Sequence, residues 1–244
     1  MPTDVRCLLA TTEPYPVLRL VGTLDGPTVD RLRVSLLTCL ADQAGTVIVD
    51  VSDLAVADPA GLAVFPEVSR AAVDWPVGEL LIYAPAGSPA EWRDGDVPVS
   101  DSLDEAYRRL DATAGPRLNA RLEPAVGAAR RARQLVTDGC GRWDVPELAG
   151  SACIAITEMV NNVVVHAQTP MTVRLGLRDG ALHVAVRDWS LAPAVFSGLA
   201  PTTSAGGRGL LLIDTVARRW GASELADGKV VWAALYPEDE AHTN

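Results

Sequence analysis

The order of apolar runs along this chain restricts its fold more than any single residue does. In the first half, short β-branched or apolar runs alternate with stretches in which apolar residues recur every three or four positions. The first pattern predicts strands and the second predicts helices. The expected strands are residues 17–21, 46–51 and 80–83, and the expected helices follow Asp25, Gly61 and Ser102. Strand–helix alternation of this kind is typical of a small α/β domain.

The second half of the chain has a different order of elements. Its patterns predict two helices, a hairpin, a third helix and a closing strand. The first expected helix opens at Pro124, and the second has a capping box at Asp144 and Glu147. A hairpin is expected to turn at Asp179-Gly180. A third helix over 209–220, ended by Gly221, and a strand over 229–236 are expected to follow. This order predicts a second α/β layer domain, joined to the first by a linker within residues 111–120.

The distribution of charge supports this division. The net charge is −10, and residues 1–115 hold 8 basic and 18 acidic side chains, whereas residues 116–244 hold 13 of each. We therefore expect one domain over residues 1–113 and another over residues 118–244. An acidic half argues against direct binding to nucleic acid, which requires a basic surface.

Composition argues against several other classes of protein. No apolar run approaches the roughly 18 residues of a membrane span, and the start of the chain lacks the basic and apolar regions of a secretory signal. The four cysteines are scattered, with no Cys-x-x-Cys pair, and only three histidines accompany them. A zinc site is therefore not expected. Reduced core thiols and a cytoplasmic location are the simpler interpretation.

A polar stripe marks the helix expected after Glu147. Glu158, Asn162 and His166 are spaced four residues apart, so they share one face of an otherwise apolar helix. Polar groups that are buried on such a helix need partners, and a magnesium nucleotide would supply them. The carboxylate could act as a general base, and the amide oxygen suits Mg²⁺ as a ligand. Taken alone, the stripe fits a solvated helix face equally well. His166 fits a cap at the helix end better than a chemical role.

Two further features complete a candidate nucleotide site. Asp188 follows the apolar run 182–186, where a carboxylate can accept a hydrogen bond from an exocyclic amine such as that of adenine. Alone, it is better explained as a turn aspartate. In the run Gly206-Gly207-Arg208-Gly209, the glycines allow backbone to approach phosphate ahead of a helix N-terminus, and the arginine can pair with phosphate oxygens. The three features in this order predict nucleotide binding.

The order and spacing of these residues resemble those of a known superfamily. Residues 157–166, Thr-Glu-Met-Val-Asn-Asn-Val-Val-Val-His, resemble the N-box of the GHKL ATPases. Within that superfamily, the chain is similar to the anti-sigma factor serine kinases. Asp188 matches the adenine-binding aspartate, and Gly207-Arg208-Gly209-Leu210 matches the glycine box at the end of the ATP lid. The resemblance covers about residues 118–237.

This resemblance implies a Bergerat-fold α/β sandwich that binds ATP or ADP with Mg²⁺. It implies that Glu158 is the base that activates a substrate serine and that Asn162 holds the magnesium ion. The implied nucleotide-binding residues are Asn162, Asp188, Gly207, Arg208, Gly209 and Leu210. The threonine that the family's final strand often carries near the adenine corresponds to Val230 here.

The first half resembles the STAS domain of anti-sigma factor antagonists, over roughly residues 5–111. Gly22-Thr23-Leu24-Asp25 and Val49-Asp50-Val51-Ser52 match its early strands. Asp58-Pro59-Ala60-Gly61-Leu62 aligns with the family's Asp-Ser-Ser-Gly-Leu, in which a serine receives phosphate. Both hydroxyls are missing here, so we expect a STAS-like domain that cannot be phosphorylated at the usual position.

Together the two resemblances favour regulation of transcription by partner switching. The ATP-binding domain is expected to bind a sigma factor or a STAS-domain antagonist, and a homodimer is a further option. Whether it acts as a serine/threonine kinase on the antagonist stays open at this point. The alternative is a nucleotide-responsive scaffold protein without kinase activity, whose STAS-like domain blocks its own ATP-binding domain. A histidine kinase fragment is disfavoured, because the sequence shows no coiled-coil phosphoacceptor helix ahead of residue 118.

Overall fold

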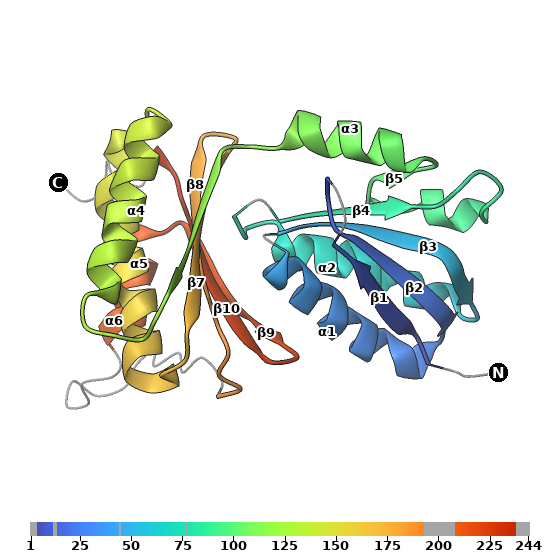
Figure 1. The fold of residues 1–244 in the computed structure, drawn as a ribbon, viewed down its shortest axis with the longest axis horizontal. Helices are drawn as coiled ribbons and strands as arrows, with labels where there is room; N and C mark the ends of the chain where they lie inside the picture. The colour runs from blue at the N-terminus through green and yellow to red at the C-terminus, as the bar shows by residue number, and fades with distance from the viewer. Residues whose placement is uncertain (1–3, 12–13, 44, 77, 193–207, 238–244) are drawn as a thin grey trace. The chain divides into compact units, whose positions relative to one another are not determined.

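Two sheets, one in each half of the chain, organise the fold (Figure 1). The computed structural model describes residues 4–11, 14–43, 45–76, 78–192 and 208–237. The chain divides into a first unit, residues 1–73 and 78–114, and a second unit, residues 74–77 and 115–244. Each unit combines helices with a sheet, so the expected α/β class is confirmed.

The first unit has a five-stranded sheet in the order β1-β2-β3-β4-β5. β1 runs antiparallel to β2, and the other neighbours are parallel. The strands are β1 (Arg6–Ala10), β2 (Val17–Leu24), β3 (Thr46–Val56), β4 (Glu79–Tyr83) and β5 (Val99–Ser100). The first four residues of β3 are all buried, as expected for a central strand that is covered on both faces.

Helices cover both faces of this sheet. They are α1 (Gly26–Asp42), α2 (Val64–Ala72), α3 (Leu103–Thr113) and the short 3₁₀ helices η1 (Pro59–Ala63) and η2 (Ala90–Arg93). Asp25 caps α1 as its sequence predicts: its Oδ1 accepts from the Thr28 backbone N–H at 3.2 Å, and Thr28 Oγ1 accepts from the Asp25 N–H at 2.9 Å. α1 and α2 lie on one face and α3 on the other, where it packs with Ile48 and Leu81 (Figure 1).

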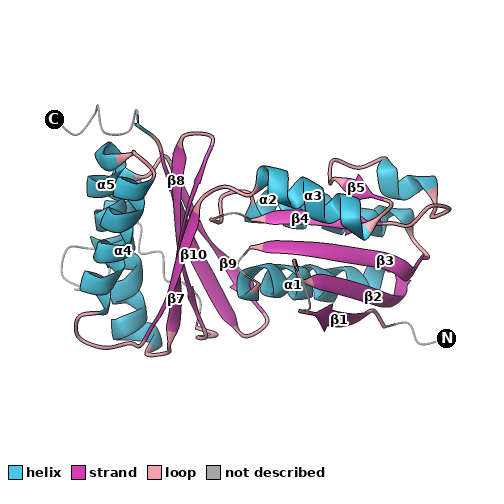
Figure 2. Cartoon of the chain, turned by 45° about the horizontal axis from the view of Figure 1, so that its top comes forward, coloured by secondary structure: helices cyan, strands magenta, loops and turns pink. Residues whose placement is uncertain are grey.

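The second unit has a five-stranded sheet in the order β6-β7-β8-β10-β9, antiparallel throughout (Figure 2). The strands are β6 (Arg117–Leu122), β7 (Met171–Arg178), β8 (Ala181–Asp188), β9 (Arg219–Leu225) and β10 (Gly228–Leu235). The β7–β8 hairpin turns at Asp179 and Gly180, with φ values of 52° and 76°. Positive φ at both positions is what a two-residue type I′ turn requires. The hairpin therefore forms at the predicted residues.

Three helices lie on one face of this sheet (Figure 1): α4 (Ala128–Arg142), α5 (Ala149–Asn162) and α6 (Arg208–Val216). A 3₁₀ turn, η3 (Pro146–Leu148), precedes α5, and a π-helical turn, η4 (Val163–Ala167), follows it. Alternate residues of β7, β8 and β10 point to the helices. Central core members are Ile156, Met159, Val160, Val173, Leu175, Val184, Val186, Ala233 and Leu235. The second unit is thus a two-layer α/β sandwich.

Among the described residues, one helical stretch is long and apolar enough to cross a membrane by length and composition alone. It is Pro146–Ala167, 22 residues that include an 18-residue window with a mean hydropathy of 1.5. The expectation that no apolar run approaches a span overlooked this stretch, because Glu158 interrupts it. The stretch contains α5, whose Ile156, Met159 and Val160 are buried in the core of the second unit. This burial indicates a core helix that packs on a sheet.

The end of the last helix differs from the prediction. α6 stops at Val216, short of Trp220, and β9 begins at Arg219. Gly221 therefore lies inside a strand and ends no helix. A Cβ at Gly221 would stand 2.9 Å from the Trp232 ring, so the glycine is needed for packing between β9 and β10.

Three boundaries earlier in the second unit also differ. α4 begins at Ala128, not at Pro124, and Gly127 is its N-cap. The capping box is absent: the 3₁₀ turn before α5 has no side-chain cap, and Asp144 has a φ of 57°. β6 begins at Arg117, so part of the expected linker is a strand.

Candidate nucleotide-binding site

The polar stripe lies on α5. Glu158 and Asn162 are half-buried and one turn apart, and His166 is exposed on the π-helical turn η4. In the part of the chain that the structure describes, neither the Glu158 carboxylate nor the Asn162 amide has a hydrogen-bond partner. Both groups are therefore available to a ligand.

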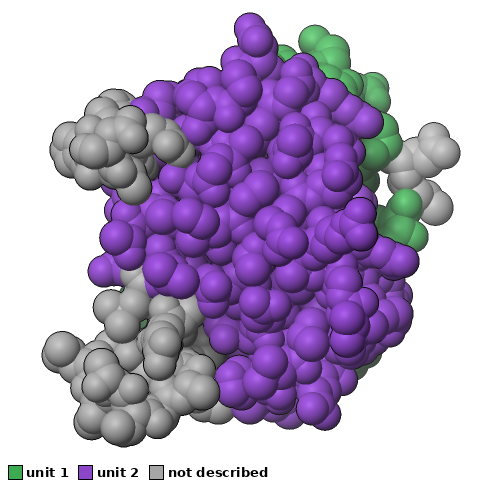
Figure 3. Space-filling view, turned by 90° about the vertical axis from the view of Figure 1, so that its left-hand side faces the viewer, with its two compact units in different colours: residues 1–73, 78–114 green, residues 74–77, 115–244 purple. Residues whose placement is uncertain are grey.

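Glu158 opens onto a groove between α4, α5 and α6, which we call the α5 groove. Its volume is about 420 Å³, and it is lined by Arg133, Cys153, Ile154, Thr157, Glu158 and Leu212. Arg133 donates to Thr157 Oγ1 at 3.2 Å, which holds a guanidinium in the wall of the groove. Burial raises the pKa of the Cys153 thiol, so it stays protonated at neutral pH. The helices that border the groove belong to the face of the second unit shown in Figure 3.

Asp188 ends β8 on the face that α5 covers, because it lies two residues beyond the core residue Val186. The residue is only 2% exposed. Lys229 Nζ lies 3.1 Å from its Oδ1, and the Ser190 backbone N–H donates to the same oxygen at 2.8 Å. No described residue donates to Oδ2. The carboxylate is thus neutralised and keeps one oxygen for a ligand.

Lys229 is a site residue that the sequence analysis missed. It stands directly opposite Asp188 in the β8–β10 ladder. Its ammonium also donates to the backbone oxygens of Ser190 at 3.3 Å and Ala192 at 2.9 Å. The sequence carries one signal for this residue, because Lys229 is the only lysine in the chain.

Val230, which aligns with the family's threonine near the adenine, lies on the opposite face of the sheet from the Asp188 side chain. It pairs with Arg187, so its side chain points to the face of the sheet away from the helices. Lys229, the residue before it, shares the face of Asp188. Gly228 allows the close approach of the two strands, because a Cβ there would stand 2.0 Å from the Asp188 carbonyl oxygen.

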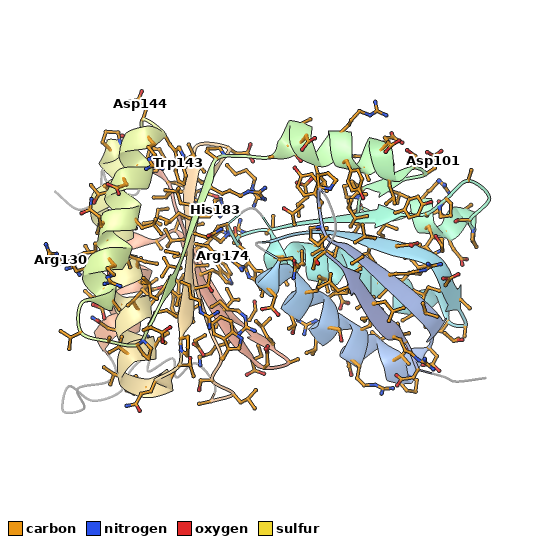
Figure 4. All side chains as sticks on the ribbon, viewed as in Figure 1. Asp101, Arg130, Trp143, Asp144, Arg174 and His183 are labelled. Carbon is orange, nitrogen blue, oxygen red and sulfur yellow. The ribbon has the colours of Figure 1, made fainter. Side chains whose placement is uncertain are left out.

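A second ion pair lies at the same end of the β8–β10 ladder, on the face of the sheet away from the helices. Arg187, 1% exposed, pairs with Asp227 at 2.6 Å, and its guanidinium lies 4.4 Å from the centroid of the Trp189 ring. Arg174 and His183 extend from β7 and β8 on the side away from the helices (Figure 4), and strand alternation places Arg187 on this same face.

The glycine box lies at the start of α6. Gly206-Gly207 fall outside the described residues, and Arg208-Gly209-Leu210 form the first turn of α6. α6 packs on α5, and its Ile213 belongs to the core. The box therefore opens a helix that contacts the helix carrying the polar stripe.

The segment of the first unit that resembles the STAS phosphorylation motif forms the 3₁₀ helix η1. Asp58 Oδ1 accepts from the Ala60 N–H at 3.0 Å, which caps η1. Pro59 and Ala60 are exposed at the two positions where a STAS domain offers hydroxyls. Ser52 lies on β3 instead, where its hydroxyl donates to Asp50 at 2.5 Å.

Comparison with known families agrees with both units. Residues 121–235 match the family described as the histidine kinase-like ATPase domain, and residues 8–74 match the STAS domain. The chain joins a STAS domain to a histidine kinase-like ATPase domain. The resemblances found in the sequence are therefore confirmed, and the ATPase domain implies ATP binding in general terms.

Several known proteins are similar to parts of this chain. The uncharacterized protein SCO4941 of Streptomyces coelicolor is 39% identical over 80 residues, which is 31% of this chain and 76% of that protein. The RsbU and RsbW domains of Rv1364c from Mycobacterium tuberculosis match 50% of this chain and 32% of theirs, with 19% identity and a TM-score of 0.38. The anti-sigma factor antagonist SpoIIAA in its unphosphorylated form matches 43% of this chain and 98% of its own, with 24% identity and a TM-score of 0.33.

Proposed function

We propose that the histidine kinase-like ATPase domain binds ATP or ADP through Asn162, Asp188 and the glycine box Gly207-Arg208-Gly209-Leu210. The observation that carries this proposal is the Asp188 carboxylate. It is buried, neutralised by Lys229 and left with one oxygen that no described residue satisfies. An exocyclic amine of a nucleobase would satisfy that oxygen, and an unsatisfied buried acceptor costs free energy.

The donors on α5 fit a magnesium nucleotide. Asn162 offers an amide oxygen, a hard ligand of the kind Mg²⁺ prefers, and we assign it to the metal. Bound ATP would supply the phosphoryl group for transfer. Glu158 would accept the hydroxyl proton of a substrate serine at its carboxylate, which is half-buried and opens onto the α5 groove.

The pairing of a STAS domain with a histidine kinase-like ATPase domain supports a regulator of the partner-switching type. We propose that its partners are a sigma factor or a STAS-domain antagonist, that the α5 groove receives the substrate serine, and that the chain acts in the cytoplasm. Control of transcription would then follow from which partner the ATPase domain holds.

A second function has its own supporting observation. Pro59 and Ala60 stand where a STAS motif offers two hydroxyls, while Asp58 caps η1 by accepting from the Ala60 N–H. A folded STAS domain that offers no hydroxyl at this position suits a nucleotide-responsive binding protein without phosphotransfer. Transfer from radiolabelled ATP to any STAS-domain substrate would decide in favour of the kinase.

Isothermal titration calorimetry tests the nucleotide site. The wild type is expected to bind Mg-ADP. In Asp188→Asn, Lys229 would hold the amide oxygen and turn the amide N–H₂ towards the base, so affinity should fall about 10- to 100-fold. Asn162→Ala should remove most of the magnesium dependence. Asn161→Ala, an exposed neighbour on the same helix, should change neither. No binding by the folded wild type at millimolar nucleotide would contradict the proposal.

A further inference from the structure

The hydrogen bonds at Asp188 are unevenly divided between its two carboxylate oxygens. Oδ1 accepts from Lys229 Nζ at 3.1 Å and from the Ser190 N–H at 2.8 Å, whereas Oδ2 accepts from no described residue. Because Oδ1 already has two strong donors, a ligand meets a carboxylate with one available oxygen instead of two.

The Lys229 ammonium is fully hydrogen-bonded at this position. An ammonium has three N–H donors, and the three acceptors within reach are Asp188 Oδ1 and the backbone oxygens of Ser190 and Ala192. The side chain is 11% exposed. Every donor is therefore used, and the ammonium compensates a buried carboxylate that would otherwise lack a counter-charge.

We propose that Lys229 is a specificity-determining positioning residue that makes Asp188 a one-oxygen acceptor. The site then takes a nucleobase with a single amino donor at this point and disfavours a base with two adjacent N–H donors. This inference rests on the proposed nucleotide site and adds to it the residue that sets the choice of base.

The hydrogen-bonding edges of the purines explain the choice. Adenine presents one exocyclic amine, which one carboxylate oxygen satisfies. Guanine presents a ring N–H beside its amine, and this pair needs both oxygens of a carboxylate. With Oδ1 occupied, one guanine donor would stay unpaired in a buried site, a loss that typically lowers affinity by about 10-fold or more.

Calorimetry of the full chain with Mg-ADP and Mg-GDP tests the inference. The wild type is expected to bind ADP at least about 10-fold more tightly than GDP. Lys229→Met removes the ammonium and opens Oδ1, so the preference should fall by about the same factor. Lys229→Arg keeps a cationic donor and should restore part of the preference.

Asp227→Asn is the matched control, because it breaks the ion pair with Arg187 at the same end of the ladder but on the opposite face. Its ADP preference should equal that of the wild type.

If Lys229→Met weakened the binding of ADP and the binding of GDP by one common factor, Lys229 would have a structural role alone and the inference would be overturned. If the wild type bound ADP and GDP with equal affinity, the inference about Lys229 would be overturned, but the proposed nucleotide site would not be contradicted. A wild type that binds neither would contradict the proposed function as well.

The wild-type chain offers a second test that does not depend on a variant that folds. Lys229 is the only lysine, so an amine-reactive ester can acetylate Lys229 or the α-amine, and mass spectrometry separates the two products. The hydrogen-bonded ammonium should react far more slowly than the α-amine. Mg-ADP should slow the reaction further and Mg-GDP should not. Equal protection by both nucleotides, or acetylation as fast as at the α-amine, would overturn the inference.

Discussion

At the scale of single residues, Glu158 is the group whose chemical role is most open to test. It is half-buried on α5 and has no described hydrogen-bond partner. Glu158→Gln keeps the shape of the side chain but cannot accept a proton. Phosphoryl transfer to a STAS-domain substrate, measured with radiolabelled ATP, should fall on the order of 10²- to 10⁴-fold, while calorimetry should show unchanged nucleotide binding.

Glu147→Gln provides the control for this measurement. Glu147 is an exposed carboxylate in the turn before α5, so its loss should leave the transfer rate unchanged. Equal rates for Glu158→Gln and the wild type would remove Glu158 from the role of base and favour the nucleotide-responsive binding protein.

Residues of the site were predictable where their relation is local. Glu158 and Asn162 share a helix face because four residues make about one turn, which is fixed by spacing alone. Lys229 was missed, and Val230 was named in its place, because the pairing of Lys229 with Asp188 depends on the register of two strands that are far apart in sequence. A shift of one residue turns each side chain to the other face, and no local pattern fixes that choice.

At the scale of secondary-structure elements, replacing either of two glycines by alanine is expected to change the stability of the chain, in opposite directions. A Cβ at Gly221 in β9 would meet the Trp232 ring at 2.9 Å, whereas a Cβ at Gly141 in α4 would meet nothing within 4 Å. Gly221→Ala should therefore destabilise the chain by about 1–3 kcal/mol through overpacking. Gly141→Ala should stabilise it by about 0.5–1 kcal/mol, because alanine favours a helix.

Chemical denaturation followed by circular dichroism measures both changes. If Gly221 ended a helix, as its sequence suggested, a substitution there would leave the contact between β9 and β10 untouched. A stabilised Gly221→Ala chain would contradict the observed packing. Loss of stability in Gly141→Ala would contradict the open setting of that residue on α4.

The elements themselves were predictable to different degrees. The β7–β8 hairpin was predictable from the sequence, because Asp179-Gly180 has the residue types of a type I′ turn and apolar and polar residues alternate in both flanking strands. The end of α6 was not, because residues 209–220 keep a helical spacing of apolar side chains past Val216. Pairing with β10 draws Arg219–Leu225 into the sheet instead, and tertiary pairing commonly overrides local propensity.

At the scale of the whole molecule, the STAS domain is expected not to be a substrate of the ATPase domain in the same chain. Phosphoryl transfer needs an oxygen nucleophile in line with the phosphate, and Pro59 and Ala60 provide none. Incubation with radiolabelled ATP should leave residues 1–111 unlabelled, even though fusion raises the effective concentration of this domain. Label in this region, mapped by mass spectrometry, would contradict the expectation, and a STAS-domain protein with both serines serves as the positive control.

The Asp188–Lys229 ion pair at the end of the β8–β10 ladder also bears on how these two strands align. Asp188 and Lys229 are 41 positions apart, so no tight turn dictates their alignment. A slip by two positions would keep every core side chain on its proper face, yet it would set Asp188 against Asp227. The same slip would push the Lys229 ammonium over Val186, inside the apolar core. Like charges opposite one another repel, and a charge without a partner is costly in that interior. Electrostatics thus penalises a slip in this direction, although the hydrophobic pattern alone would tolerate it.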